Sequence, residues 1–458
     1  MTDATLDNAP NAFVRRETLA QQPAPLSVAG PVAWIRSNLF SSPLGTVLTL
    51  VSLYIVIVGV EDLVRFYILD AVWTGANREA CLADKIGRPV GACWPYVVDR
   101  FQYFVYGSYP VSQRWRVNIV FVMFALGVVW LLWNKAPLKK LGAFFFFIIL
   151  PLSGFILLLG GATAEGLLRN LLLLSAALAV LYAVVSFVPS LAFWTPAPLL
   201  AAEREASPWQ RFYRPKRLIL MALVVFGLIA VIQQQLGLPR VDTGLWGGMT
   251  VTFLISAVGI VFSLPLGVVL ALGRRSRLPI IQLLSVIFIE FVRGVPLITV
   301  LFMANTMLPL FVPQEYSPDR LLRPLIGVAV FASAYMAEVI RGGLQAIPKG
   351  QFEGAMSLGL GYGQMMRLII LPQALRIVIP GIVNTFIGLF KDTTLVAIVG
   401  IFDFLNTIQA TLVDPTWATP TTRTTGYAFA AIFYFLCCWG MSRYSIAVEK
   451  RLAAGQRR

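Results

Sequence analysis

Apolar runs of about 20 residues recur along this chain, and that is the length an α-helix needs to cross the hydrocarbon core of a bilayer. Hydrophobic residues make up 58% of the sequence and charged residues only 13%, which lies outside the range of soluble globular proteins. We therefore predict an all-α polytopic membrane protein with about ten transmembrane helices. The runs lie near residues 44–67, 117–134, 142–161, 170–189, 218–236, 247–273, 283–312, 324–345, 373–400 and 426–446.

Basic residues are concentrated in short segments between alternate runs, and the formal net charge is +15. Lysine and arginine accumulate in cytoplasmic loops, so these clusters predict that both termini are cytoplasmic and that the long loop at 70–116 is periplasmic. Residues 1–43 and 449–458 are then cytoplasmic tails. The same clustering gives little support to nucleic-acid binding. The clusters are Lys135, Lys139 and Lys140; Arg211, Arg214, Lys216 and Arg217; Arg274, Arg275 and Arg277; and Lys450, Arg451, Arg457 and Arg458.

Several classes of chemistry are excluded by residues that the sequence lacks. There is no histidine, which removes His-based triads, imidazole metal sites and His proton relays together. Cysteine and the acidic residues form no cluster at metal-ligand spacing. A G-x-x-x-x-G-K-[ST] phosphate loop is also absent, so this chain should not hydrolyse ATP itself. We predict no metal, no cofactor and no catalytic residue, which disfavours a membrane enzyme.

Residues 346–372 lie between two apolar runs and are typical of two short helices joined by a turn. Pro348 suits the start of a helix, because its missing N–H costs nothing in the first turn. Gly359 suits the end of that helix, since glycine adopts positive φ at low cost. Pro372 should then break or kink the second helix as the chain returns to the membrane.

The same loop contains a spacing that is rare as a whole, E-x-A-x-x-x-G at 353–359 and I-x-L-P at 369–372. It resembles the EAA loop of bacterial ABC importer permeases. The segments E-F-V-R-G-V-P-L at 290–297 and E-V-I-R-G-G at 338–343, and K-D-T-T-L at 391–395, are similar to the polar-amino-acid branch of that family. One departure is Gly354, where the family often has Ala; it slightly lowers helix propensity, and docking should survive it.

The resemblance covers residues 246–448 and implies a type I permease core of five helices in that part of the chain. Residues 44–245 would be a membrane extension with about five spans, similar to that of the larger permease subunit of general L-amino-acid importers. The role of this extension stays open. The resemblance also implies that the loop at 346–372 couples transport to ATP hydrolysis. Its coupling residues would be Glu353, Ala355, Gly359, Leu371 and Pro372.

The implied activity is ATP-driven import of polar or broad-range L-amino acids across the bacterial inner membrane by alternating access. The implied partners are a second homologous permease subunit, a dimer of a separate ATPase that binds ATP and Mg, and a periplasmic solute-binding protein. An ion-gradient-driven secondary transporter is the alternative. That class predicts internal repeats with paired broken helices, and the first 245 residues do not repeat the motifs of the second half.

Two acidic and two basic residues recur at the same spacing near predicted helix ends. Glu290 and Arg293 are three residues apart, as are Glu338 and Arg341. Each could be a local ion pair on one helical face, or the four could line a cytoplasmic gate. Gly294-Val295-Pro296 beside the first pair suits a bend.

Lys391 and Asp392 interrupt an apolar stretch and cannot share one helical face, because they are adjacent. An unwound or cavity-lining segment would solvate them. By resemblance, this block lies near the solute path, and Asp392 is the direct contact that we would choose, with Thr393 and Asn384 as polar lining. The alternative is that Lys391 and Asp392 cap helix ends and pair with neighbours.

Cys81 and Cys93 both lie in the predicted periplasmic loop. An oxidising compartment permits a disulfide that would close a segment of 11 intervening residues, and the alternative is a pair of free thiols.

Overall fold

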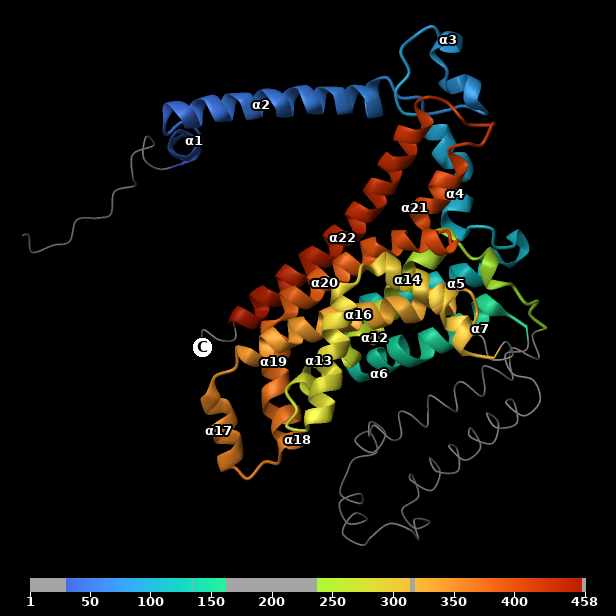
Figure 1. Ribbon diagram of the computed structural model, residues 1–458. Helices are drawn as coiled ribbons and strands as arrows, with labels where there is room; N and C mark the ends of the chain where they lie inside the picture. The colour runs from blue at the N-terminus through green and yellow to red at the C-terminus, as the bar shows by residue number, and fades with distance from the viewer. Residues whose placement is uncertain (1–29, 134, 162–236, 314–317, 455–458) are drawn as a thin grey trace, which may run out of the picture. The chain divides into compact units, whose positions relative to one another are not determined.

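The computed structural model describes residues 30–133, 135–161, 237–313 and 318–454, and the regular secondary structure of these ranges is helical apart from isolated bridges (Figure 1). The predicted runs at 170–189 and 218–236 lie outside the described residues. Two compact units are present. The first comprises Met1–Ala71 and Pro89–Ala92, and the second comprises Val72–Arg88 and Cys93–Arg458.

The first unit contains a long helix that is apolar on every side. Helix α1 (Pro31–Leu39) precedes α2 (Pro43–Val64), which continues into a π-helical turn, η1 (Arg65–Leu69). Ser42 begins α2 by accepting the N–H of Gly45 at 3.1 Å. None of the residues of α2 is buried within the structure, and the 27-residue segment Pro43–Leu69 is long and apolar enough to span a membrane. It matches the run predicted at 44–67.

In the second unit, α5 (Arg114–Leu132), α12 (Gly248–Arg274) and α16 (Leu322–Gln345) match predicted runs. So do α20 (Ile379–Asp392), which a 3₁₀ turn extends as η9 (Thr393–Val399), and α22 (Thr422–Ala454). A continuous helical segment also covers the run at 142–161. It consists of α6 (Lys139–Phe144), η4 (Phe145–Ile149) and α7 (Leu150–Leu159). Six helices in the described ranges are long and apolar enough to cross a membrane, and the segment from α6 to α7 is not among them; the number is seven if a bent pair counts as one span.

That bent pair divides the run predicted at 283–312 into two helices. Helix α13 (Pro279–Gly294) and α14 (Leu297–Thr306) meet at 105°, and the short α15 (Leu308–Phe311) follows. The break falls at Gly294-Val295-Pro296, as the sequence predicted. Val295 has an extended backbone and Pro296 lacks an N–H, so the helical hydrogen bonding cannot continue through this point.

Helices α12 and α16 cross closely at a glycine. A Cβ atom on Gly267 would lie 2.7 Å from Cγ and 2.8 Å from Cβ of Met336, and 3.1 Å from the backbone nitrogen of Ala337. Small residues let helix backbones approach in this way in membranes, where packing rather than the hydrophobic effect holds helices together. The crossing therefore tolerates no larger side chain.

Two hydrophobic clusters occupy the two ends of α12. Val251 and Ile255 belong to the first cluster, together with Leu301 of α14 and Val328 of α16. Ala271, about four turns further along α12 than Ile255, belongs to the second cluster. That cluster includes other side chains of α16 and reaches residues 347–374. Because α12 has 27 residues, its ends are about 40 Å apart.

The N-terminal end of α12 also receives part of the preceding extension. Helix α4 (Trp94–Tyr106) contacts α12, α22 and α21 (Phe404–Thr411). Gly248 permits the contact, since a Cβ there would lie 2.2 Å from the carbonyl oxygen of Phe104. The extension therefore packs directly on the end of the core that lies away from residues 347–374.

We expect Gly267→Val to destabilise the protein, because the added side chain must displace Met336 or the backbone of Ala337. Overpacking of this kind costs about 1–3 kcal/mol. Thermal unfolding of the purified protein in detergent measures the effect. Gly440→Val in α22 is the matched control, since a Cβ there meets no atom within 4 Å. Equal unfolding temperatures for the two variants would refute the close crossing.

Candidate functional site

The loop at 346–372 folds as a helical hairpin. Helix α17 (Lys349–Ser357) begins after Pro348, which occupies the N-cap rather than the first helical position. Gly359 follows the helix end with φ of 72°, so the positive φ predicted for this glycine is confirmed. A β-carbon at this position would be strained whatever the free space around it.

The second arm continues through Pro372, where the sequence predicted a break or a kink. Helix α18 (Tyr362–Met365), the π-helical turn η8 (Met366–Ile370) and α19 (Leu371–Ile377) form one continuous helical segment. Pro372 lies in the first turn of α19 and does not end the helix. A π turn shifts the hydrogen-bonding register just before the proline, and this accommodates the missing N–H that would otherwise break the helix.

The hairpin has one face packed against the membrane core and one open face. On the inner face, Ala355 is 2% exposed and packs in the second cluster with Ile370. Leu371 is partly buried in the same cluster. The other expected coupling residues, Glu353, Gly359 and Pro372, are exposed. The exposed face also carries large apolar side chains, which are Met356 (57%), Leu358 (76%) and Tyr362 (56%).

The four predicted charged residues form one network instead of two local pairs. Arg341 binds Glu338 at 2.8 Å, as its i,i+3 spacing suggested. Glu290, however, pairs with Arg274 of α12 at 2.8 Å, and Arg293 reaches Glu338 at 3.6 Å. Arg274 also binds Glu338 at 2.7 Å. The local pairing of Glu290 with Arg293 was wrong because α12 delivers a competing arginine between α13 and α16.

Glu338 is the common acceptor of this network, and its side chain is only 15% exposed. Removing one partner of a largely buried ion pair leaves an uncompensated charge, which costs more than the pair itself contributes. The network therefore holds the ends of α12, α13 and α16 in one arrangement. In the sequence, Arg274 is only one of three arginines in a basic loop, and spacing along the chain gives no signal of this contact.

The predicted solute-path residues lie along α20 and its 3₁₀ extension. The chain is not unwound at Lys391-Asp392: α20 ends at Asp392 and tightens into η9. Asp392 is half-buried and Lys391 is exposed. Thr393 is buried and donates its hydroxyl to the carbonyl of Phe390 at 2.9 Å. Asn384 is exposed and precedes Asp392 by about 12 Å along the helix, so these residues do not converge on one point.

A buried polar cluster beside this block was missed in the sequence. Asp403 caps α21, accepts the backbone N–H of Asn406 at 3.0 Å and accepts the hydroxyl of Tyr434 at 2.8 Å. Asn406 donates to the carbonyl of Thr394 at 2.9 Å. Burial raises the pKa of the Asp403 carboxyl above its usual range, although these hydrogen bonds oppose the shift. The available signal was an aspartate immediately before an apolar helical pattern, which is typical of an N-cap.

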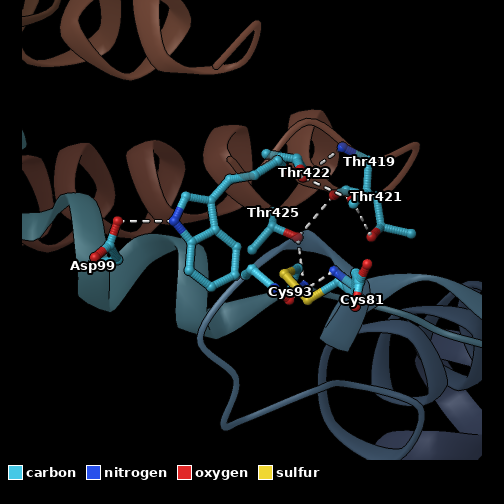
Figure 2. Close-up of a disulfide and its surroundings, with 10 residues drawn as sticks. Cys81, Cys93, Asp99, Thr419, Thr421, Thr422 and Thr425 are labelled. Atoms are coloured by element: carbon cyan, nitrogen blue, oxygen red, sulfur yellow. Dashed lines mark hydrogen bonds between the residues drawn. A yellow bond between two sulfur atoms is a disulfide. The ribbon is translucent and has the colours of Figure 1, made fainter. Parts of the chain in front are cut away.

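Cys81 and Cys93 form a disulfide, with their Cα atoms 5.8 Å apart (Figure 2). The N–H of Cys93 donates to the hydroxyl of Thr425, in the first turn of α22, at 2.9 Å. Trp417 donates its indole N–H to Asp99 of α4 at 2.8 Å. The disulfide therefore belongs to a junction between α4 and the segment that precedes α22.

Two further contacts hold α4 to this junction. The hydroxyl of Tyr96 lies 2.6 Å from that of Thr411, and burial raises the pKa of Tyr96 to about 12. Arg100 forms an ion pair with Asp414. The pKa of Asp414 lies below its ordinary value, mainly because its carboxylate accepts the N–H of Thr416, with Arg100 contributing. We name these contacts together with the disulfide the outer junction.

Comparison with known proteins supplies the family. Residues 263–453 match the family model described as "Binding-protein-dependent transport system inner membrane component". This range includes the hairpin, the ion network and the block at 391–395. The inner membrane amino-acid ABC transporter permease protein YhdY of Escherichia coli (strain K12) is 41% identical over 435 residues, which cover 95% of this chain and 96% of that protein. The chain belongs to the amino-acid ABC transporter permeases.

A second relative gives the same result over nearly the full length. The glutamate/glutamine/aspartate/asparagine transport system permease protein BztC of Rhodobacter capsulatus is 41% identical over 460 residues, covering 97% of this chain and 99% of that protein. A solved structure, "Crystal structure of an amino acid ABC transporter with histidines", is 28% identical and covers 44% of this chain and 92% of its own, with a TM-score of 0.39. This permease is a transport subunit of the inner membrane.

Loss of the disulfide should weaken the outer junction. We expect Cys81→Ser with Cys93→Ser to lower the free energy of unfolding by about 2–3 kcal/mol, because a short loop is no longer closed in the unfolded chain. Thermal unfolding in detergent measures it, with Cys437→Ser and Cys438→Ser as the control that removes two free thiols. Quantitative alkylation of Cys81 and Cys93 without reductant would rule out the bridge.

Proposed function

We propose that this permease imports polar or broad-range L-amino acids, with a second homologous permease, two copies of a separate ATPase that binds ATP and Mg, and a periplasmic solute-binding protein. The name of BztC, which covers two acidic amino acids and their two amides, supports this substrate class. In this proposal both termini and the hairpin are cytoplasmic. The outer junction is then periplasmic, where an oxidising compartment favours its disulfide.

The observation that carries the proposal is that the hairpin packs against the membrane helices with one face and exposes the other. Ala355 on its inner face belongs to the same hydrophobic cluster as Ala271 of α12 and Met336 of α16. Its exposed face carries Glu353 together with Met356 and Leu358, two large apolar side chains at a position where a polar surface is the norm. A partner that binds the exposed face therefore acts on a hairpin whose other face is packed against the transmembrane helices.

Alternating access requires two packings of similar free energy. ATP binding and the loaded binding protein shift their populations only by binding one packing more tightly than the other. The bend of 105° between α13 and α14 and the ion network at the ends of three helices are elements that such a change would rearrange. In the proposed mechanism no bond is made or broken in this chain.

Gly359→Leu should uncouple the permease from its ATPase. Leucine penalises the φ of 72° that the turn requires, and its bulk would collide with a cleft on the partner. We expect normal expression and loss of both copurified ATPase and transport. Gly359→Asn separates the two causes, because asparagine tolerates the left-handed conformation while still adding bulk. If the ATPase copurifies with the Gly359→Leu permease and its stimulated ATP hydrolysis keeps the wild-type rate, this loop has no coupling role.

Asp392→Asn should reduce transport, and cationic amino acids should suffer more than neutral ones. The change keeps the shape of the side chain but removes its charge, and a charge-assisted hydrogen bond is roughly twice as strong as a neutral one. Uptake of a series of cationic and neutral amino acids into proteoliposomes measures this difference. Stimulation of the ATPase by the loaded binding protein should persist at least in part. Asp84→Asn, in the exposed helix α3 (Ala83–Ile86), is the matched control. Equal loss for every substrate, with stimulation abolished, would assign Asp392 a structural role.

A further inference from the structure

Two adjacent arginines at the end of α12 reach different neighbours. Arg274 is the last residue of the helix and Arg275 is its C-cap residue. Successive side chains at a helix end point about 100° apart, so one helix end can be joined to two sets of partners.

Arg274 joins α12 to the two neighbouring membrane helices. Its guanidinium binds Glu290 of α13 at 2.8 Å and Glu338 of α16 at 2.7 Å. With a side chain 24% exposed, it lies in a setting where water screens these charges less than at an open surface. A displacement of the end of α12 therefore acts on α13 and α16 through this residue.

Arg275 joins the same helix end to the coupling hairpin. Its Nη1 donates to the carbonyl oxygen of Leu344, in the last turn of α16, at 3.1 Å. A cation is favoured there because the last carbonyls of a helix carry partial negative charge. The guanidinium carbon also lies 5.6 Å from the centroid of the Phe352 ring of α17, within cation–π distance. Arg275 thus contacts both α16 and α17.

We propose that Arg275 is a positioning residue that transmits displacement of α17 to α12, and that Arg274 passes it on to α13 and α16. This inference rests on the proposed function, since the displacement comes from the ATPase. Movement of the Phe352 ring must shift or release Arg275. Because Arg275 and Arg274 share one backbone, the same movement changes the geometry of the ion network.

The test uses the full complex with its ATPase, reconstituted with the binding protein. Arg275→Gln should lower hydrolysis stimulated by the loaded binding protein, and transport with it, by roughly tenfold, as expected for loss of one charge-assisted hydrogen bond. The amount of copurified ATPase should stay at the wild-type value, and the unfolding temperature should fall by no more than the loss of one hydrogen bond accounts for. Arg277→Gln makes the same charge change two residues further on, at a position that is exposed as Arg275 is, and it should leave stimulation unchanged.

Conservative variants separate positioning from a merely structural role. Arg275→Lys keeps the charge and one donor, so it should recover part of the stimulation. Phe352→Leu should reduce stimulation and Phe352→Trp should preserve it, because the ring face is what the cation contacts. The double variant Arg275→Gln with Phe352→Leu should lose no more stimulation than the more impaired single variant, because both changes break the contact between Arg275 and the Phe352 ring.

Wild-type stimulation in Arg275→Gln, or fully additive losses in the double variant, would overturn the transmission role. Loss of copurified ATPase in Arg275→Gln would also overturn it, because the residue would then serve docking or stability. Absence of any ATPase in the wild-type preparation would instead overturn the proposed function, and this inference with it.

Discussion

The rest of the membrane core depends on the close crossing of α12 and α16. Gly267 allows an approach so close that a Cβ there would lie 2.7 Å from Cγ of Met336 and 3.1 Å from the backbone nitrogen of Ala337. Because α12 extends about 40 Å, one crossing fixes where both of its ends lie. One end packs against α4 and α21, which take part in the outer junction, and the other carries the ion network and the packing of the hairpin. A change at this crossing would therefore alter both ends together.

Local features of the fold followed from the sequence because their causes are local. A length of about 20 apolar residues predicts a spanning helix at any position. The left-handed turn at Gly359 and the break at Gly294-Val295-Pro296 follow from backbone properties of glycine and proline. Family resemblance drew attention to the loop at 346–372, which lies inside the range that matches the family model.

Features that depend on tertiary contacts could not be predicted in the same way. Glu290 pairs with Arg274, 16 residues away, because two helices converge, and no spacing rule contains that information. Asp403 is buried beside Tyr434 of α22, which lies 31 residues further along the chain and reaches it only after folding. Pro372 continues a helix because the preceding turn is π-helical, and Met366 and Ile370 of that turn are buried in the second cluster. Tertiary packing overrode the expectation in each case.

The outer junction has a consequence for biogenesis. The contact between Cys93 and Thr425 joins residues 332 positions apart, whereas the disulfide joins residues only 12 apart. At synthesis rates of about 5–20 residues per second, Thr425 of α22 is added roughly 15–65 s after Cys93. The staple can close long before its docking surface exists. A covalent bond can thus hold the loop closed before Thr425 is available to accept the hydrogen bond of Cys93.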